Sequence, residues 1–168
     1  MFGLRQAQSE ISKKGRANLV EGNLDVIRFH KQGLKNTVGT SGTALTEEHA
    51  RIIRRFTDTV VLILDGDGAG NKATVRMVEI FLEEGITVYA VLLPMGEDPD
   101  TFAKGKSGED LEQWIEDNEK DFVMLKIALA AKNIDERPEE KGSDWWTGYS
   151  FSWLGILYAR AGMGQKVS

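Results

Sequence analysis

The sequence contains no cysteine, only three prolines and no long run of apolar residues. Without cysteine the chain cannot build a disulfide framework or a thiolate metal site. No apolar stretch approaches the roughly 18 residues that a membrane-spanning helix requires. The first residues also lack the basic and apolar regions of a secretory signal peptide. These absences argue against a disulfide-rich secreted scaffold and a membrane-spanning protein, and we expect a cytoplasmic protein.

Positive charge is also in short supply. The chain has 21 Lys and Arg against 26 Asp and Glu, which gives a net charge of −5 and a pI of about 5.2. A protein that holds nucleic acid through bulk charge is basic, because phosphate neutralisation supplies most non-specific affinity. Binding to nucleic acid would therefore need bound cations, a local basic patch or a basic partner domain. The length of 168 residues, 41% of them hydrophobic, suits one ordinary domain with its own core.

Apolar runs and helical patterns alternate along the first part of the chain. The runs at 59–64 and 87–93 are almost continuously apolar, which is typical of strands buried on both faces of a parallel sheet. Thr46 is a candidate N-cap and Gly85 a candidate C-cap for two of the intervening helices. The alternation predicts an α/β fold with a parallel sheet flanked by helices. The expected strands are residues 18–20, 37–40, 59–64 and 87–93, and the expected helices are 24–31, 47–56 and 71–84.

The pattern changes after Pro94. Helices are expected at 109–116 and 121–132, and the charged segment 135–142 has the composition of a linker. Six aromatic residues then fall between positions 145 and 158. This tail is interpreted either as an aromatic packing or partner-binding segment, or as a foreign or poorly ordered extension.

Acidic residues gather where the predicted strands end. Asp65 and Asp67 directly follow strand 59–64, in a loop whose glycines allow a tight turn and the close approach of a phosphate. Glu21 follows the first strand, with Asp25 one helical turn further on. The last clear strand is followed by Asp98 and Asp100.

These acids are expected to converge, because ligands of open parallel sheets bind beyond the carboxyl ends of the strands. Without compensation such a cluster would repel itself. Hard divalent cations relieve the repulsion, and Mg²⁺ favours carboxylates together with water and substrate phosphate.

Other motifs with a similar loop fit less well. An EF-hand would need Asp or Asn where Ala69 stands and Glu where Arg76 stands. A Walker loop would need a Gly-Lys-Ser or Gly-Lys-Thr triplet, which the sequence lacks. The haloacid-dehalogenase phosphatases share a strand followed by Asp-x-Asp-Gly, but their usual Thr is Ala69 here and their motif normally opens the fold. A solvated polar turn explains the loop alone, but not the acids at the other strand ends.

Taken together, four segments resemble the Toprim domain of bacterial replicative DNA primases. The Glu element and the Asp-x-Asp element occur across topoisomerases and several nucleases. The Gly-Thr-Ala-Leu-Thr and Glu-Asp-Pro-Asp elements, in this order, are more specific to primases. The resemblance covers most of the chain, from about Phe2 to Arg137, and implies a Rossmann-like parallel sheet with a helical C-terminal extension. The segments are Val20-Glu21-Gly22-Asn23-Leu24-Asp25-Val26-Ile27, Gly42-Thr43-Ala44-Leu45-Thr46, Asp65-Gly66-Asp67-Gly68-Ala69-Gly70 and Leu92-Leu93-Pro94-Met95-Gly96-Glu97-Asp98-Pro99-Asp100.

The resemblance implies a function and roles for individual residues. Short RNA primers would be made on a single-stranded DNA template from nucleoside triphosphates, with Mg²⁺ or Mn²⁺ as cofactor and the replicative helicase bound through regions that this chain lacks. The implied catalytic, metal-binding residues are Glu21, Asp65 and Asp67, and the further acids of the metal site are Asp25, Asp98 and Asp100. The candidates for substrate binding are Thr43, Lys72 and Arg76, for which a turn or a solvated helix face is the simpler alternative.

The same resemblance predicts the domain organisation. We expect a lead-in segment at 1–17, the Toprim catalytic domain at 18–104, a helical subdomain at 105–134, and a linker with the aromatic tail at 135–168. The zinc-binding domain, basic subdomain and helicase-binding region of a primase are not in this sequence, so we expect an excised domain or a truncated homologue. The alternatives are a Toprim-type nuclease that uses water as the nucleophile, and a catalytically silent domain that binds nucleic acid or protein.

Overall fold

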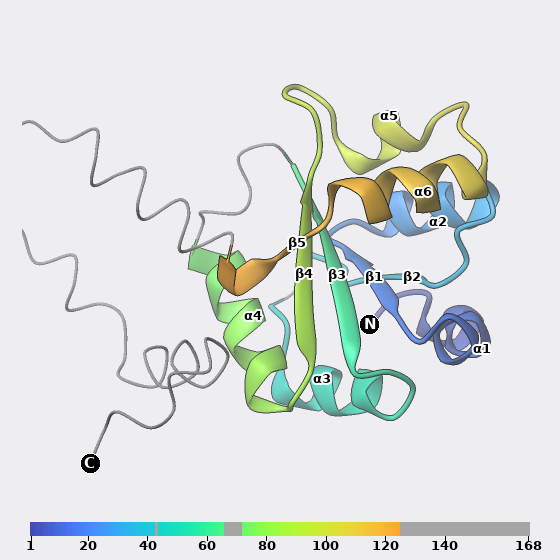
Figure 1. The fold of residues 1–168 in the computed structure, drawn as a ribbon. Helices are drawn as coiled ribbons and strands as arrows, with labels where there is room; N and C mark the ends of the chain where they lie inside the picture. The colour runs from blue at the N-terminus through green and yellow to red at the C-terminus, as the bar shows by residue number, and fades with distance from the viewer. Residues whose placement is uncertain (43, 66–71, 125–168) are drawn as a thin grey trace, which may run out of the picture. The chain divides into compact units, whose positions relative to one another are not determined.

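The computed structural model describes residues 1–42, 44–65 and 72–124. Residues Met1–Lys126 form one compact unit, in which helices flank a single sheet (Figure 1). The fold is α/β, as the alternating sequence pattern predicts. The strands are β1 (Ala17–Val20), β2 (Thr37–Gly39), β3 (Thr59–Leu64), β4 (Thr87–Leu92) and β5 (Lys120–Asp121). The helices are α1 (Leu4–Lys14), α2 (Asn23–Lys31), α3 (Glu47–Arg54), α4 (Lys72–Glu83), α5 (Pro99–Ala103) and α6 (Gly108–Asn118).

The strand order of the sheet is β2-β1-β3-β4-β5. The first four strands run parallel, and β5 pairs antiparallel with β4. After β1 the chain adds β2 on one side and then returns to place β3 on the other side of β1. The order of the strands therefore reverses between β1 and β3, which makes this pair the topological switch point of the sheet.

Strand β3 lies at the centre of the core. All of its residues after Thr59 are buried, as its apolar run predicts. On one face of the sheet, Val61 and Ile63 pack in a core cluster with residues of α2, α5 and α6. On that face Phe102 of α5 packs against Trp114 of α6 with 4.4 Å between the ring centroids. Since side chains alternate along a strand, Val60 and Leu62 face the opposite side.

Helix ends follow local capping signals. Thr46 caps α3, because its hydroxyl accepts a hydrogen bond from the backbone N–H of His49 at 3.3 Å, as predicted. Gly85 follows α4 with a φ of 73°, which suits its predicted role as the C-cap. At the start of α6, Gly108 lies so close to α2's last turn that an added Cβ would sit 2.7 Å from the carbonyl oxygen of Gln32. The packing of α6 on the end of α2 therefore depends on a glycine.

Three elements were not expected from the sequence. Helix α1 occupies most of the predicted lead-in segment, and Phe2 before it pairs with Gly39 at the edge of β2. Helix α5 begins at Asp98-Pro99, where the sequence suggested only an acidic loop. The helix predicted from residue 121 begins one residue later, because residues 120–121 form β5 and residues 122–124 are helical. The remainder of that predicted helix and the aromatic tail lie outside the described residues.

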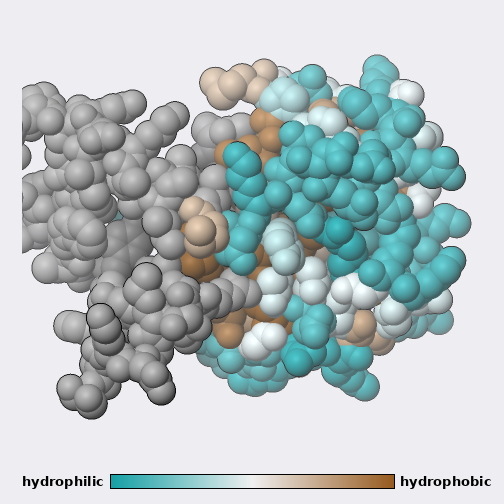
Figure 2. Space-filling model, viewed as in Figure 1, coloured by the Kyte–Doolittle hydropathy of each residue, from teal (hydrophilic) through white to brown (hydrophobic). Residues whose placement is uncertain are grey.

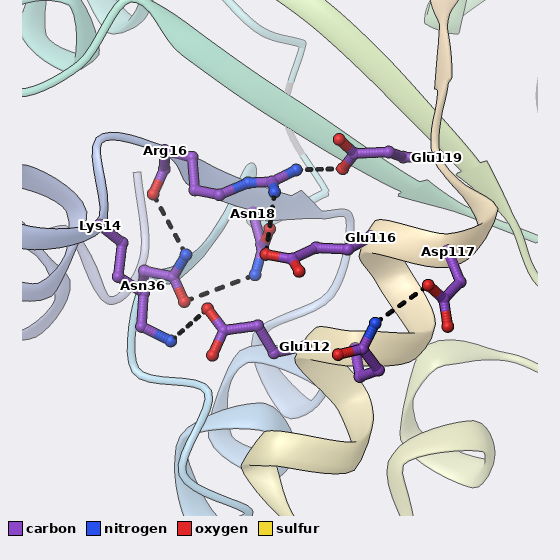
Figure 3. Close-up of polar contacts among 9 residues, drawn as sticks. Lys14, Arg16, Asn18, Asn36, Glu112, Glu116, Asp117 and Glu119 are labelled. Atoms are coloured by element: carbon purple, nitrogen blue, oxygen red, sulfur yellow. Dashed lines mark hydrogen bonds and ion pairs between the residues drawn. The ribbon is translucent and has the colours of Figure 1, made fainter.

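A cluster of ion pairs lies at the amino ends of β1 and β2 (Figure 3). Lys14 Nζ lies 2.5 Å from Glu112 Oε1, and Arg16 pairs with Glu119 and, at 3.6 Å, with Glu116. The Asn36 side chain donates to the backbone carbonyl oxygen of Arg16 at 3.1 Å. These contacts, hereafter the amino-end cluster, join α6 to the start of β1.

The face that carries α5 and α6 is largely hydrophilic (Figure 2).

None of the described helices combines the length and the apolar character needed to cross a membrane.

Candidate active site

The predicted acids Glu21 and Asp65 stand on either side of the topological switch point. Glu21 directly follows β1 and Asp65 directly follows β3, and both are exposed. The two strands pair in parallel register, from Ala17 opposite Val60 to Leu19 opposite Leu62, so their carboxyl ends lie at the same edge of the sheet. This is the position at which open α/β sheets bind their ligands.

Asp25 is fixed beside this edge by the chain that enters α2. Its carboxylate accepts a hydrogen bond from the backbone N–H of Gly22 at 3.0 Å. A Cβ on residue 22 would lie 2.6 Å from Asp25 Oδ2, so a side chain at this position would displace the carboxylate. The Glu21-Gly22 pair and Asp25 thus form one local unit at the end of β1.

The environment of Asp25, including the charges of other acids, shifts its pKa. Its pKa is raised above the ordinary value of 3.8, first by burial and then by the negative charges of Asp98, Asp100 and Asp65, while the hydrogen bond from Gly22 opposes the rise. Acids from the ends of β3 and β4 therefore share one electrostatic environment with the start of α2. The strand-end positions predict such a convergence, and the set of converging acids, which includes Asp67, stays a prediction.

Asp98 has a structural function as the N-cap of α5. Its Oδ1 accepts a hydrogen bond from the backbone N–H of Thr101 at 2.7 Å, and Pro99 occupies the first helical position. The hydrogen bonds from Thr101 hold the pKa of Asp98 below its ordinary value. The carboxylate is thereby kept ionised at the acidic edge.

Asp100 is engaged by a base that sequence reasoning did not assign to the site. Arg28 of α2 donates from Nε to Asp100 Oδ1 at 2.7 Å and from Nη2 to Oδ2 at 3.4 Å. The hydrogen bond and charge of Asp100 raise the pKa of Arg28. The available signal was the helical spacing of Arg28 from Asp25, which places the two residues one turn apart.

The remaining predicted residues are less well defined by the structure. Asp67 and Thr43 lie outside the described residues. Lys72 is exposed at the first position of α4, and Arg76 lies 3.4 Å from Glu79 on the same helix. Within residues 1–42, 44–65 and 72–124, no three acidic or histidine side chains form a complete metal-binding group. The predicted ligand set therefore stays a prediction in which Asp67 is required.

The donor chemistry nevertheless fits a hard divalent cation. Glu21 and Asp65 follow the two strands of the switch point, and burial together with the charges of neighbouring acids raises the pKa of Asp25. Mg²⁺ takes a few carboxylates and completes its shell with water and substrate phosphate.

The Toprim-like family profile matches residues 18–103, from β1 to the last residue of α5. The chain belongs to the Toprim-like family. This Toprim domain is 39% identical over 140 residues to a DNA primase of Aquifex aeolicus and 33% identical over 135 residues to a DNA primase of Staphylococcus epidermidis. These alignments cover 83% and 80% of this chain but 28% and 23% of the relatives. The chain thus spans about a quarter of the length of these curated relatives.

Solved structures show the same likeness. The Aquifex aeolicus primase, solved with its zinc-binding and RNA polymerase domains, matches with a TM-score of 0.69 and 34% identity, over 99% of this chain and 41% of that one. A primase catalytic domain bound to single-stranded DNA matches with a TM-score of 0.65 and 30% identity, over 77% of this chain and 42% of that one. The resemblance to the Toprim domain of bacterial DNA primases is therefore confirmed.

Proposed function

We propose that this Toprim domain is the metal-binding catalytic part of a DNA primase, which makes short RNA primers on single-stranded DNA by nucleotidyl transfer. The observation that carries the proposal is the position of Glu21 and Asp65 at the switch point, with the charges of Asp98 and Asp100 reaching Asp25 beside them. Nucleoside triphosphates are the second substrate, the replicative helicase is the partner through regions outside this chain, and the cytoplasm is the site of action.

The proposed catalytic residues are Glu21, Asp65 and Asp67, which would hold Mg²⁺ or Mn²⁺. Such ions, when bound, can stabilise both the attacking and the leaving oxygen of an in-line displacement at phosphorus. Asp25 orients the turn after β1 through its hydrogen bond to Gly22. Lys72 and Arg76, on the helix that follows the Asp65 loop, are proposed to face the triphosphate or template, and Thr43 to line the site.

The proposed catalytic domain runs from residue 18 to 104, after a lead-in at 1–17 and before a helical subdomain at 105–134 and a tail at 135–168. A net charge of −5 gives this chain no overall attraction for a template. Specific binding to DNA usually needs several Lys or Arg contacts with phosphates. The basic DNA track is therefore proposed to lie on another subdomain of the parent protein.

The test incubates labelled nucleoside triphosphates and a single-stranded DNA template with Mg²⁺ or Mn²⁺. The chain alone should bind the template weakly and make little primer, because it lacks the basic track. Joined covalently to the remainder of the RNA polymerase domain of the Aquifex aeolicus primase, it should make template-dependent primers, and Asp67→Ala in the fusion should abolish them. The Arg51→Ala fusion is a matched control, because it removes a charged side chain of the exposed α3–α4 surface.

The other outcomes contradict the proposal in different ways. Cleavage of DNA or RNA that Asp67→Ala abolishes would indicate a Toprim nuclease. A fusion that binds template but neither extends nor cleaves would indicate a catalytically silent binding domain. Robust synthesis by the isolated chain would place the DNA track on this domain.

A further inference from the structure

The contact between Arg28 and Asp100 occupies both oxygens of a carboxylate at the acidic edge. The guanidinium Nε and Nη2 each donate to a different oxygen, at 2.7 and 3.4 Å. The two residues are 72 positions apart and join α2 to α5. A forked contact of this kind is the strongest arrangement of an arginine with a carboxylate.

This pairing changes what Asp100 can do. The guanidinium fork places a donor on each oxygen of Asp100, so a cation could reach only the outer lone pairs of this carboxylate. The positive charge of Arg28 also opposes a cation nearby, since like charges repel over several ångströms in a partly buried site. With Asp98 engaged in capping α5, the acids after β4 are held by protein donors.

The pair is not needed to dock α5. The Phe102 ring packs against Trp114, with Lys106 3.9 Å above its centroid, and Phe102 and Ala103 are buried in the core cluster. Arg28 and Asp100 side chains are 32% and 39% exposed, and pairs this exposed contribute little to stability. The folded structure therefore has no strong requirement for a base at position 28.

We propose that Arg28 is a positioning residue that neutralises Asp100 and keeps it out of the metal site of this domain. The inference rests on the proposed function. Arg28 lowers the negative charge at the acidic edge by one unit and limits the protein ligands to those at the ends of β1 and β3. Affinity for a free divalent cation stays weak as a result, and substrate phosphates complete the coordination shell.

A cycle of four proteins tests the inference: the 168-residue chain, Arg28→Gln, Asp100→Asn and the double variant, each titrated with Mn²⁺ by calorimetry. Arg28→Gln should bind Mn²⁺ roughly tenfold more tightly, because it frees a carboxylate and removes a positive charge close to the ion. The double variant, which has the net charge of the parent, should return to the parent affinity. Arg28→Lys, which keeps the charge but loses the fork, should lie between the parent and Arg28→Gln.

Arg51→Gln is the matched control, because it removes an arginine charge from the Glu47 and Glu84 ion pairs of α3 and α4. It should leave the Mn²⁺ affinity unchanged. The inference is overturned if Arg28→Gln binds no more tightly than the parent, which would leave the pair a structural tie. It is also overturned if the double variant binds much more weakly than the parent, which would make Asp100 a ligand. Failure of the proposed metal centre is distinct, since parent binding would then survive Asp65→Asn/Asp67→Asn.

Discussion

The two ends of the parallel sheet use acidic side chains in opposite ways. At the amino ends of β1 and β2, Glu112 and Glu119 of the amino-end cluster each meet a lysine or arginine (Figure 3). At the carboxyl ends, the pKa of Asp25 is raised by burial and by the charges of Asp98, Asp100 and Asp65. Acids that the protein pairs with its own bases stabilise the fold, whereas acids gathered with few bases are suited to the cation and phosphate of the proposed function.

The largest expected effect is at the carboxyl-end acids. Asp65→Asn/Asp67→Asn should weaken Mn²⁺ binding by about 100-fold or more, because a hard cation depends on charged oxygen ligands. The melting temperature should not fall, since the substitution relieves repulsion with Asp25. Calorimetric titration and thermal unfolding of the same samples measure both quantities. Glu112→Gln is the control, because it neutralises an acid at the amino end of the sheet and should keep its Mn²⁺ affinity. Equal losses of Mn²⁺ affinity in both variants would contradict the difference between the two ends.

The opposite result is expected at the amino-end cluster. The Arg16 side chain is only 17% exposed and pairs with Glu116 and Glu119. Arg16→Ala should lower the free energy of unfolding by about 2 kcal/mol, because half-buried carboxylates lose a charged donor. Urea unfolding measures this change, and Mn²⁺ affinity should remain that of the parent. For the exposed pair of Arg51, Arg51→Ala should cost less than about 1 kcal/mol, so a similar loss in both variants would contradict the structural function of the cluster.

A smaller effect should follow from crowding Asp25. Gly22→Ala places a methyl group 2.6 Å from Asp25 Oδ2, while the backbone φ of −92° suits alanine. The carboxylate must turn away, and Mn²⁺ affinity should fall roughly fivefold, because the turn that carries Glu21 loses the hydrogen bond that orients it. Gly15→Ala gives the reverse pattern, because it meets no atom within 4 Å but has a φ of 67°. Gly15→Ala should lose stability and keep its Mn²⁺ affinity. A loss of Mn²⁺ affinity in Gly15→Ala would mean that backbone strain alone disturbs the site.

The sequence alone predicts those features of the fold that neighbouring residues encode. The apolar runs of β3 and β4 and the Thr46 cap are local, and they were predicted correctly. Helix α1 was missed because its buried face consists of little more than Ala7 and Ile11. Helix α5 was missed because Asp98-Pro99 was interpreted as a ligand motif, although Asp followed by Pro is also a start signal for a helix.

In the candidate site too, residues in local motifs were predicted, whereas contacts between distant segments were not. Glu21, Asp65 and their place at the strand ends follow from local motifs and from the general topology of parallel sheets. The pairing of Arg28 with Asp100 does not, because the two residues are 72 positions apart and the orientation of α5 on α2 is a product of packing. Helical spacing from Asp25 places Arg28 near the site, but nothing in one sequence indicates that its partner is Asp100.

The smallest expected effect concerns pH, and it distinguishes two acids of the same edge. The pKa of Asp25 is raised above 3.8, so the folded protein binds this proton more readily than the unfolded chain. Ionised Asp25 therefore lowers stability at neutral pH, and this penalty disappears as the pH falls through the raised pKa toward about 3.8. Asp25→Asn should raise the urea midpoint slightly at neutral pH and leave it unchanged near pH 3, with both titrations done in a metal chelator.

Asp98 should behave in the opposite sense, because hydrogen bonds from Thr101 lower its pKa. Its contribution to stability is present above the unfolded value of 3.8 and is lost as the pH falls below it. Asp98→Asn should therefore lower the urea midpoint at neutral pH, by an amount that shrinks in acid. If both variants shifted in the same direction at neutral pH, the carboxyl-end acids would not be divided into a repelled group and a capping group. The electrostatic contrast within this edge would then be weaker than the contrast between the two ends of the sheet.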